Sequence, residues 1–336
     1  MKKEKLLIIS PSFHGYCYSI ADGFNQVGYD TTVYRYDAFD RFQEKFRNKV
    51  FYELPGKLGF DGKKIAEKDA TSKAIETFHS VNPDKLIVIK ADTLGDSFWE
   101  AVNESKIPYM LWLYDDFSRH RYTHEFLSHV PTVLSYARTE AEVFSTRNIN
   151  SHFVPNAYNP KLTDFPVERT NEIVFVGSRY ENREELVLAL AEAGIPVRAY
   201  GRQWSHHPFD RLRTWEIKRP NIPAERDIPL SEAYKVQAGA AGALNIHGLQ
   251  AGLAMRTFEV PGMQGIQLID RLDVAEFYEP GEEVLIYQSL DELIELSQRL
   301  VRDPQWSEKI REAGYKRSVA EHTFFHRAQG VDQLWA

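Results

Sequence analysis

The sequence contains one cysteine and has no long apolar run. A lone Cys17 excludes a disulfide within the chain and is typical of proteins from a reducing cytoplasm. No stretch approaches the ~18 consecutive apolar residues of a membrane-spanning helix. The apolar run at 5–10 is short and predicts a strand rather than a signal peptide. We therefore expect a cytoplasmic protein without a membrane span.

The chain also lacks an excess of basic residues and the common phosphate-binding motifs. A formal net charge of −7 argues against a general nucleic-acid-binding protein and disfavours DNA as a partner, although the basic cluster at 202–219 leaves room for a local basic groove. Neither a P-loop nor a G-x-G-x-x-G motif occurs, which argues against ATPases and dehydrogenases. The pair His206 and His207 has no third ligand at a recognisable spacing, so we predict no metal site.

Short apolar runs alternate with helical patterns along the 336 residues. The predicted strands of the first half are 5–10, 30–37, 84–90, 108–116 and 131–136, with helices at 16–28, 62–81 and 94–105. A stretch rich in proline and asparagine at 152–172 predicts a linker. The strands of the second half are 172–178, 196–201, 242–247, 265–270 and 283–287. Buried strands that alternate with helices predict an α/β protein with two doubly wound parallel sheets.

Three loops of the second half follow predicted strands and carry candidate binding residues. Loops at the carboxyl ends of parallel strands bind ligands in such folds, because N–H groups of the following helices face them. The candidates are Gly177, Ser178 and Arg183 in the first loop, Asn245, His247 and Gly252 in the second, and Arg256 and Glu259 in the third. Glycines let a ligand approach the backbone, and arginines bind phosphate.

Arg256 and Glu259 lie three residues apart in a predicted short helix at 254–263. Arg256, in the first turn, would face an anion such as a diphosphate, together with Arg183. Glu259 lies on the same helical face and would be repelled by phosphate, so it suits the hydroxyls of a ribose. The alternative is an ion pair between the two side chains that only stabilises the helix.

Polar residues also follow predicted strands of the first half. His14 follows the first strand, and Asp115 and Asp116 end the strand at 108–116. An imidazole or carboxylate at this edge could act as a general base, so these three are the candidate catalytic residues. The alternatives are a helix cap for Asp115 and an ordinary loop position for His14.

Five motifs within residues 171–330 are shared with a known family. They are "NEIVFVGSRYENR", "LNIHG", "MRTFEVPG", "FYEPGEEVLIY" and "HTFFHR". With them the chain resembles GT-B glycosyltransferases of the group 1 branch, and more narrowly the CgeB-like spore-maturation proteins. The resemblance implies two Rossmann-like domains that face a central cleft. Residues 1–157 would form the acceptor side and 158–320 the nucleotide-sugar domain, and a final helix at 321–336 would pack back on the first domain.

The resemblance also implies an activity. It is the transfer of a hexosyl or pentosyl group from a UDP-, GDP- or dTDP-sugar to a hydroxyl of a surface glycan precursor, a natural product or a modified DNA base. No metal and no tightly bound cofactor are expected. In retaining relatives a glutamate matching Glu259 holds the donor ribose, and another acidic residue lies eight positions earlier, where this chain has Ala251. The match at Glu259 leads us to expect retention of the anomeric configuration. The alternatives are a non-catalytic nucleotide-sugar-binding protein, which Ala251 favours, and a sugar epimerase on the same fold.

Overall fold

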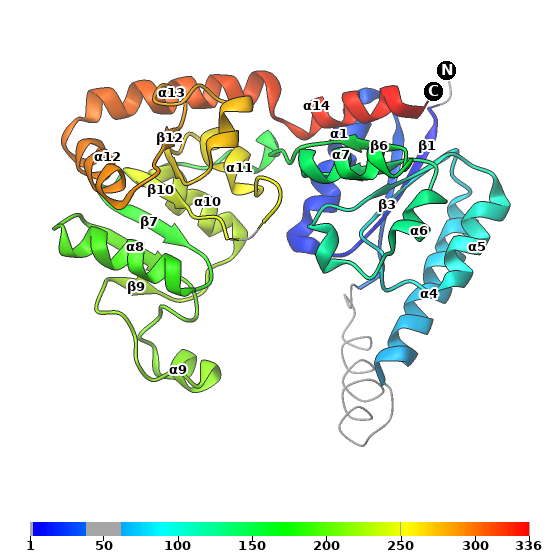
Figure 1. Cartoon of the computed structure of the whole chain (residues 1–336), viewed down its shortest axis with the longest axis horizontal. Helices are drawn as coiled ribbons and strands as arrows, with labels where there is room; N and C mark the ends of the chain where they lie inside the picture. Colours follow the sequence, from blue (N-terminus) through cyan, green and yellow to red (C-terminus); the bar gives the residue numbers. More distant parts are fainter. Residues whose placement is uncertain (1–2, 38–61, 249, 336) are drawn as a thin grey trace. The chain divides into compact units, whose positions relative to one another are not determined.

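The computed structural model describes residues 3–37, 62–248 and 250–335 (Figure 1). The predicted domain ranges also include residues 1–2, 38–61, 249 and 336, which lie outside the described residues. The described chain divides into two compact units. The first comprises the residues up to Pro155 and those from Phe324 onward, and the second comprises Asn156–Thr323.

The first unit is built on a parallel sheet with the strand order β2-β1-β3-β4-β5-β6. Its strands are β1 (Lys5–Ser10), β2 (Asp30–Arg35), β3 (Lys85–Ile89), β4 (Tyr109–Trp112), β5 (Val133–Ser135) and β6 (Ser151–Phe153). Its α-helices are α1 (Tyr16–Val27), α4 (Gly62–Val81), α5 (Asp96–Ser105), α6 (His124–Ser128), α7 (Arg138–Thr146) and α14 (Phe324–Asp332). The chain moves from β1 to β2 and returns on the other side of β1 with β3. The strand order therefore reverses between β1 and β3, and in open α/β sheets ligands bind outside the carboxyl ends of the strands at such a point.

The second unit repeats the arrangement with the strand order β12-β11-β10-β7-β8-β9, again in parallel pairs. Its strands are β7 (Ile173–Val176), β8 (Val197–Tyr200), β9 (Ala224–Glu225), β10 (Gly242–Asn245), β11 (Gln267–Ile269) and β12 (Leu285–Ile286). Its α-helices are α8 (Glu181–Glu192), α9 (Pro208–Thr214), α10 (Leu230–Gly239), α11 (Arg256–Gly262), α12 (Leu290–Arg302) and α13 (Pro304–Glu321). Here the strand order reverses between β7 and β10.

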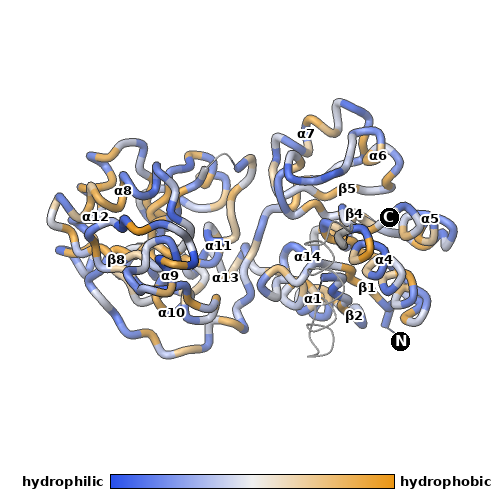
Figure 2. Tube along the Cα trace, turned by 90° about the horizontal axis from the view of Figure 1, so that it is seen from below, coloured by the Kyte–Doolittle hydropathy of each residue, from blue (hydrophilic) through white to orange (hydrophobic). Residues whose placement is uncertain are grey.

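The central strands are apolar because helices cover both faces of each sheet. Residues 6–9 of β1 and 86–89 of β3 are buried on both faces, and the hydrophobic colours follow the central strands in Figure 2. Such continuous burial is the signature of parallel sheets in α/β proteins. The predicted α/β class with two doubly wound parallel sheets is therefore confirmed.

The final helix, α14, packs against α1 of the first unit, as predicted. The two helices approach closely at Gly23, where a Cβ atom would lie 2.5 Å from the carbonyl oxygen of Phe324. Near the end of α14, Asp332 accepts a hydrogen bond from the hydroxyl of Tyr29, which in turn accepts one from Lys85 at 2.8 Å. The last helix is therefore an integral part of the first unit.

Two chain segments connect the units, at 155–156 and at 323–324. They are joined to each other, because the N–H of Tyr158 donates to the carbonyl of His322 at 3.1 Å and Tyr158 forms an isolated parallel bridge with Thr323. The second unit thus begins and ends at one place.

Two short strands were not predicted. β6 begins at Ser151 and overlaps the stretch at 152–172 that was predicted to be linker, and β9 has only two residues. Both are edge strands and lack the continuous apolar run that marks the central ones. Within the described residues, no helix combines the length and apolar character needed to cross a bilayer.

Candidate functional site

Two arginines of the second unit cross the point where its strand order reverses. Arg183, from α8, donates through Nη2 to the carbonyl of Ile246 directly after β10, at 3.0 Å. Arg256, the first residue of α11, donates through Nη2 to the carbonyl of Val176 at the end of β7, at 2.7 Å. Each guanidinium therefore reaches from one of these neighbouring strand ends to the other. A reversal point of this kind is where open α/β sheets bind their ligands.

The backbone between these strand ends is kept close by glycines. A Cβ atom on Gly201, after β8, would lie 2.6 Å from the carbonyl oxygen of Gly177, and Gly201 has a φ of +150°, so only glycine fits. The indole N–H of Trp204 donates to the same carbonyl at 2.9 Å. Ser178, the next candidate residue, presents its carbonyl to Nη1 of Arg183 at 3.1 Å. The loop after β7 is therefore fixed on both sides.

Arg183 is half-buried among aromatic rings. Its guanidinium carbon lies 5.4 Å from the ring centre of Phe175 and 4.9 Å from that of Tyr180. Burial lowers the pKa of Arg183 below its ordinary value. Among the described residues, its Nε has no hydrogen-bond partner. A bound anion would compensate this desolvated charge and supply a better acceptor than a carbonyl oxygen.

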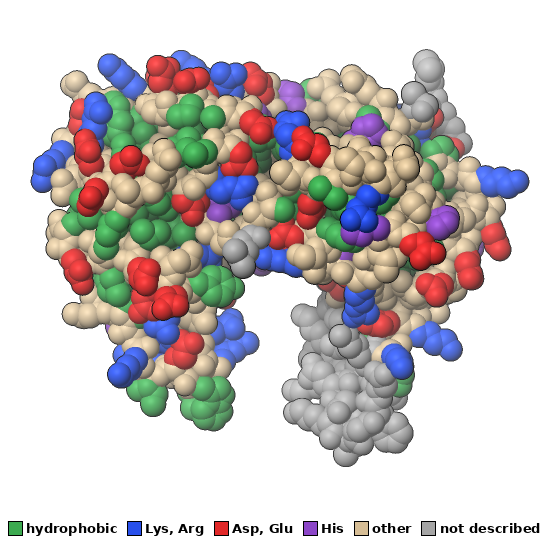
Figure 3. Space-filling model, in the orientation of Figure 1, with side chains coloured by type: hydrophobic (Ala, Val, Ile, Leu, Met, Phe, Trp, Pro, Cys, Tyr) green, Lys and Arg blue, Asp and Glu red, His purple; other side chains and the backbone are tan. Residues whose placement is uncertain are grey.

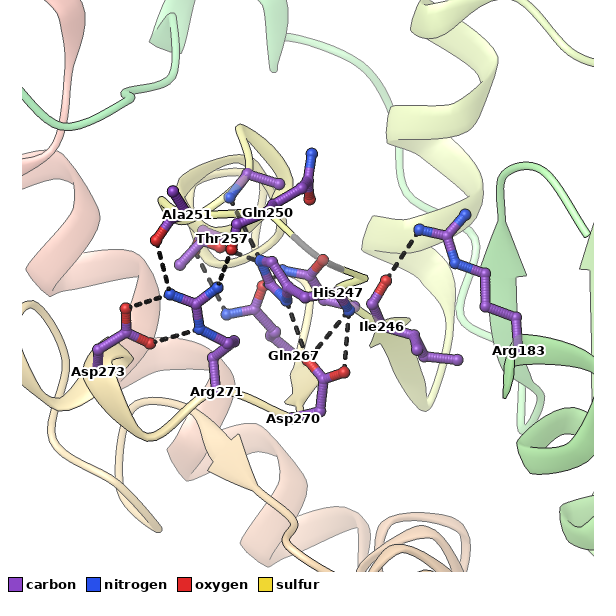
Figure 4. Close-up of polar contacts among 12 residues, drawn as sticks. Arg183, Ile246, His247, Gln250, Ala251, Thr257, Gln267, Asp270, Arg271 and Asp273 are labelled. Atoms are coloured by element: carbon purple, nitrogen blue, oxygen red, sulfur yellow. Dashed lines mark hydrogen bonds and ion pairs between the residues drawn. The ribbon is translucent and has the colours of Figure 1, made fainter. Parts of the chain in front are cut away.

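His247 anchors the loop that follows β10. Its backbone N–H donates to the carboxylate of Asp270 at 2.9 Å, its Nδ1 lies 3.0 Å from the same carboxylate, and its Nε2 accepts the N–H of Ala254 at 3.3 Å (Figure 4). These contacts correspond to the tautomer that carries hydrogen on Nδ1. The side chain is buried, so His247 positions the loop from within. The sequence predicts that His247 lies in the surroundings of the donor, and this stays a prediction.

Arg271 holds the same loop from the next strand. Its guanidinium is paired with the carboxylate of Asp273 at 2.6 Å and donates to the carbonyls of Gln250 at 2.8 Å and Ala251 at 3.1 Å (Figure 4). Neither Arg271 nor Asp270 was among the predicted site residues. The signal was available, because Asp270 ends the predicted strand at 265–270 and Arg271 follows it, so both lie at the edge where the other loops meet.

Asn245, which we predict in the surroundings of the donor, lies inside the second unit. It is buried, and its amide donates to the hydroxyl of Thr257 at 3.2 Å and to the side-chain oxygen of Gln267 at 2.7 Å. These bonds join β10, α11 and β11 inside the unit. As the last residue of β10, Asn245 points into the layer between sheet and helix, so its contribution is to hold α11 in place.

The predicted short helix is present as α11, with Arg256 in its first turn and Glu259 one turn later. Glu259 is buried and accepts a hydrogen bond from the hydroxyl of Tyr234 on α10. Gly252, in the loop before the helix, is also buried. α11 has only seven residues, so its dipole is a small contribution beside the full charges of the arginines.

In the first unit, Asp115 and Asp116 are both in ion pairs. Asp115 lies 3.3 Å from Nζ of Lys90 and 3.2 Å from the guanidinium of Arg119. Asp116 is buried, accepts a hydrogen bond from the hydroxyl of Tyr136 and lies 3.7 Å from Nε of Arg119. Asp115 is thus the more accessible carboxylate, and Asp116 lies behind it as a support. Oδ1 of Asp115 also accepts the backbone N–H of Asp116 at 3.0 Å, just before the short 3₁₀ helix Phe117–Arg119, so the cap considered for Asp115 stays an alternative, whereas Asp116 itself forms no side-chain capping bond.

Unusual backbone conformations gather at the ends of three adjacent strands of the first unit. Phe13 and His14 after β1, Lys90 and Ala91 after β3, and Tyr114 after β4 have φ values between +30° and +60°. Residues other than glycine rarely adopt this conformation, and it is held where the surrounding structure imposes it, often at functional sites. The side chain of His14 is exposed at this edge.

Two further titratable residues lie beside the aspartates. Burial lowers the pKa of His120, and the nearby charge of Lys90 lowers it further, so the imidazole is neutral at neutral pH. Burial raises the pKa of Glu140 even though its carboxylate accepts hydrogen bonds from the N–H of Phe117 and the hydroxyl of Ser135, each at 2.8 Å. Among the described residues, no three His, Cys, Asp or Glu side chains converge in a way that could hold a metal ion.

Two doubly wound parallel sheets with arginines at a reversal point place the chain in the GT-B class of folds. Residues 179–333 match the family described as glycosyl transferase-like. The spore protein CgeB of Bacillus subtilis (strain 168) is 21% identical over 307 residues, which cover 86% of this chain and 91% of CgeB. These matches confirm the resemblance to CgeB-like GT-B glycosyltransferases.

Solved structures share the fold across the whole chain. HepE from Anabaena, solved in complex with UDP-glucose, superposes with a TM-score of 0.61 at 11% identity and covers 98% of this chain and 99% of its own. A UDP-N-acetylglucosamine 2-epimerase superposes with a TM-score of 0.58 at 11% identity and covers 99% of this chain and 96% of its own. At such identities the likeness concerns the fold, which is used both by a protein that binds UDP-glucose and by an epimerase.

Proposed function

We propose that this chain is a glycosyltransferase that moves a sugar from a nucleoside diphosphate donor to a hydroxyl acceptor in the cytoplasm. The observation that carries the proposal is the pair of guanidinium groups, Arg183 and Arg256, at the reversal point of the second sheet. The match of residues 179–333 to a glycosyl transferase-like family supports the same activity. A UDP-sugar is the first donor to test, because HepE was solved with UDP-glucose.

Each residue of the proposed donor site has a distinct chemical role. Arg183 and Arg256 bind the diphosphate and stabilise the charge that develops on it as the sugar leaves. Each of them donates to a neutral carbonyl oxygen, and phosphate oxygens outcompete such acceptors because charge-assisted hydrogen bonds are stronger. Glu259 accepts hydrogen bonds from the ribose hydroxyls, and the hydroxyl of Tyr234 orients its carboxylate.

On the acceptor side, we assign Asp115 and His14 to hydrogen bonds that hold and orient the acceptor hydroxyl. Asp115 is held between Lys90 and Arg119, and His14 is exposed at the neighbouring strand end. We assign Asp116 a positioning part, because it is buried against Tyr136. We propose a retaining reaction, in which an oxygen of the departing diphosphate takes the proton.

A donor panel tests the proposal. The chain is incubated with UDP-, GDP- and dTDP-sugars without acceptor, and release of the nucleoside diphosphate is followed by chromatography. We expect slow hydrolysis of one donor that is lost in Arg256→Lys, since lysine keeps the charge but not the two-pronged geometry of arginine. Arg317→Lys serves as the control, because Arg317 lies on α13 and pairs there with Glu283 and Glu321.

The panel also separates the alternatives. Saturable nucleotide binding without turnover would favour the non-catalytic binding protein, for which the observation is Ala251 in place of an acidic residue. An epimerised sugar formed without acceptor would favour an epimerase. Absence of binding to every nucleotide would refute the donor site itself.

A further inference from the structure

A short segment of the second unit carries large hydrophobic side chains on its surface. Residues 208–218, named here the α9 tip, follow β8 and comprise α9 and the turn after it. Phe209 is 55% exposed, Leu212 65%, Trp215 86% and Ile217 81%. In Figure 3, hydrophobic and basic side chains gather at the end of the second unit where Figure 1 places α9.

The geometry of the α9 tip presents these side chains together. Phe209, Leu212 and Arg213 are spaced i, i+3 and i+4 and therefore share one face of α9. Trp215 ends the helix with a φ of 56°, a left-handed position where glycine is usual. The core does not require this indole, since most of its surface is exposed, in contrast to the fully buried Trp204. The tip therefore carries apolar area that packing within the unit does not explain.

The charges around the α9 tip are mostly paired, and those left over are positive. Asp210 is paired with Arg226 at 2.8 Å. Glu216 is paired with Arg179 at 2.7 Å and with Arg219 at 2.9 Å.

Two exposed basic residues of the α9 tip are not paired with a carboxylate in this way. Among the residues that the structure describes, Arg213 and Lys218 have no carboxylate within ion-pair distance. An exposed apolar cluster is thus bordered by two uncompensated cations.

We propose that the α9 tip docks on the surface of a lipid bilayer that contains anionic phospholipids. Tryptophan and aliphatic side chains are stabilised at the boundary between headgroups and acyl chains, and the two cations would meet lipid phosphates. A bilayer accommodates both features at once, without a matching pocket. The proposal concerns where the protein acts and does not depend on its reaction.

Other occupants fit less well. The rings of Phe209 and Trp215 could stack on nucleobases, but a nucleic acid offers no apolar phase for the aliphatic Leu212 and Ile217 beside them. A second copy of this chain is disfavoured because four side chains fall well short of the ~800 Å² per partner that a stable interface buries.

Vesicle sedimentation with the full chain tests the proposal. Vesicles of phosphatidylcholine alone are compared with vesicles that also contain phosphatidylglycerol, at low and high salt. We expect binding to the anionic vesicles that weakens with salt. The double substitution Arg213→Ser and Lys218→Ser should reduce the partition coefficient roughly 25-fold, since each basic residue near such a surface contributes about fivefold. Inorganic phosphate at the same ionic strength should not release the protein, which separates a lipid surface from a simple phosphate site.

The apolar part is tested with Trp215→Ser combined with Ile217→Ser. We expect a roughly tenfold or larger loss of binding, because both side chains would leave water on docking. Both are exposed, so the fold should tolerate the change. The matched control is Leu290→Ser with Val319→Ser, two exposed hydrophobic residues elsewhere in the second unit, which should leave binding unchanged.

Three results would overturn the proposal. The first is wild-type protein that stays in the supernatant with anionic vesicles. The second is binding that survives both double substitutions, or that the control pair reduces equally. The third is that the substitutions in the α9 tip leave vesicle binding intact but convert a dimer into a monomer in light scattering, or abolish binding to a DNA duplex.

Discussion

Replacing Arg183 by methionine separates the binding of the diphosphate from the stability of the second unit. Methionine retains an unbranched apolar stem that can still pack beside Phe175 and Tyr180. It removes the positive charge and the two hydrogen bonds to the carbonyls of Ser178 and Ile246. The same substitution thus has one consequence for the free protein and another for the complex.

The two consequences differ in size. In the free protein, two hydrogen bonds from a charged donor are lost, but so is the unfavourable burial that lowers the pKa of Arg183. These effects oppose each other, so we expect a net loss of about 1–2 kcal/mol, or about 2–8 °C in Tm. In the complex, the guanidinium would bind phosphate oxygens with bonds of about 1.5–3 kcal/mol each. Loss of two such bonds lowers the affinity for a nucleoside diphosphate roughly 100-fold or more.

Isothermal titration calorimetry with UDP measures the affinity, and urea unfolding without ligand measures the stability. Both are done well below the melting temperature, so that every variant is folded. Arg317→Met is the matched control, because it also removes an arginine with hydrogen-bonded partners but lies on α13. We expect a small stability change in both variants and a large loss of affinity only at position 183.

A folded Arg183→Met protein whose Kd for UDP stays within about threefold of the wild type would refute the reasoning. Arg183 would then only join the loops after β7 and β10. The diphosphate would have to bind elsewhere, and the role given to the reversal point of the sheet would fail.

Three further predictions follow from the same structure. Wild type should bind UDP more tightly than its 2′-deoxy form, and Glu259→Gln should lose that discrimination in calorimetry; equal affinities in wild type would contradict the ribose assignment. Burial lowers the pKa of His120, so the unfolded chain takes up a proton near pH 6.5 before the folded state does, and stability should fall as pH is lowered through that region. In urea unfolding at pH 7.5 and 5.5, His120→Gln should lose less stability than wild type, and equal losses would show that this imidazole is not responsible. Gly201→Ala should lower the free energy of unfolding by about 2 kcal/mol or more in urea unfolding, because its Cβ would lie 2.6 Å from a carbonyl oxygen. The control is Gly194→Ala, which is also at positive φ but has open space around it and should cost about 1 kcal/mol. Similar losses in the two variants would contradict the close approach at Gly201.

The sequence was sufficient for the class of fold because buried parallel strands leave a strong local signal. Residues 6–9 and 86–89 are apolar and buried at every position, which is typical of strands in a sheet covered on both faces. The edge strands β6 and β9 lack that signal, because they are short and partly exposed. Their pairing is decided by the neighbouring strand and not by their own composition.

The loops of the candidate site could be located from the sequence, but the direction of their side chains could not. Arg183 and Arg256 do lie at the predicted edge of the sheet. Asn245 and His247 lie in the predicted loops yet point inward, because Gln267 and Asp270 of the next strand supply their partners. Such pairs join residues more than twenty positions apart, so the local sequence pattern does not predict them.

The place of α14 has a consequence for the order in which the chain can fold during synthesis. The first unit needs this helix to cover α1, yet residues 324–332 are translated after the whole of the second unit. The second unit, Asn156–Thr323, is complete before them. The unit that is translated first must therefore wait with one helix missing while the later unit closes, and until α14 arrives the face around Gly23 stays open to chaperones and to other nascent chains.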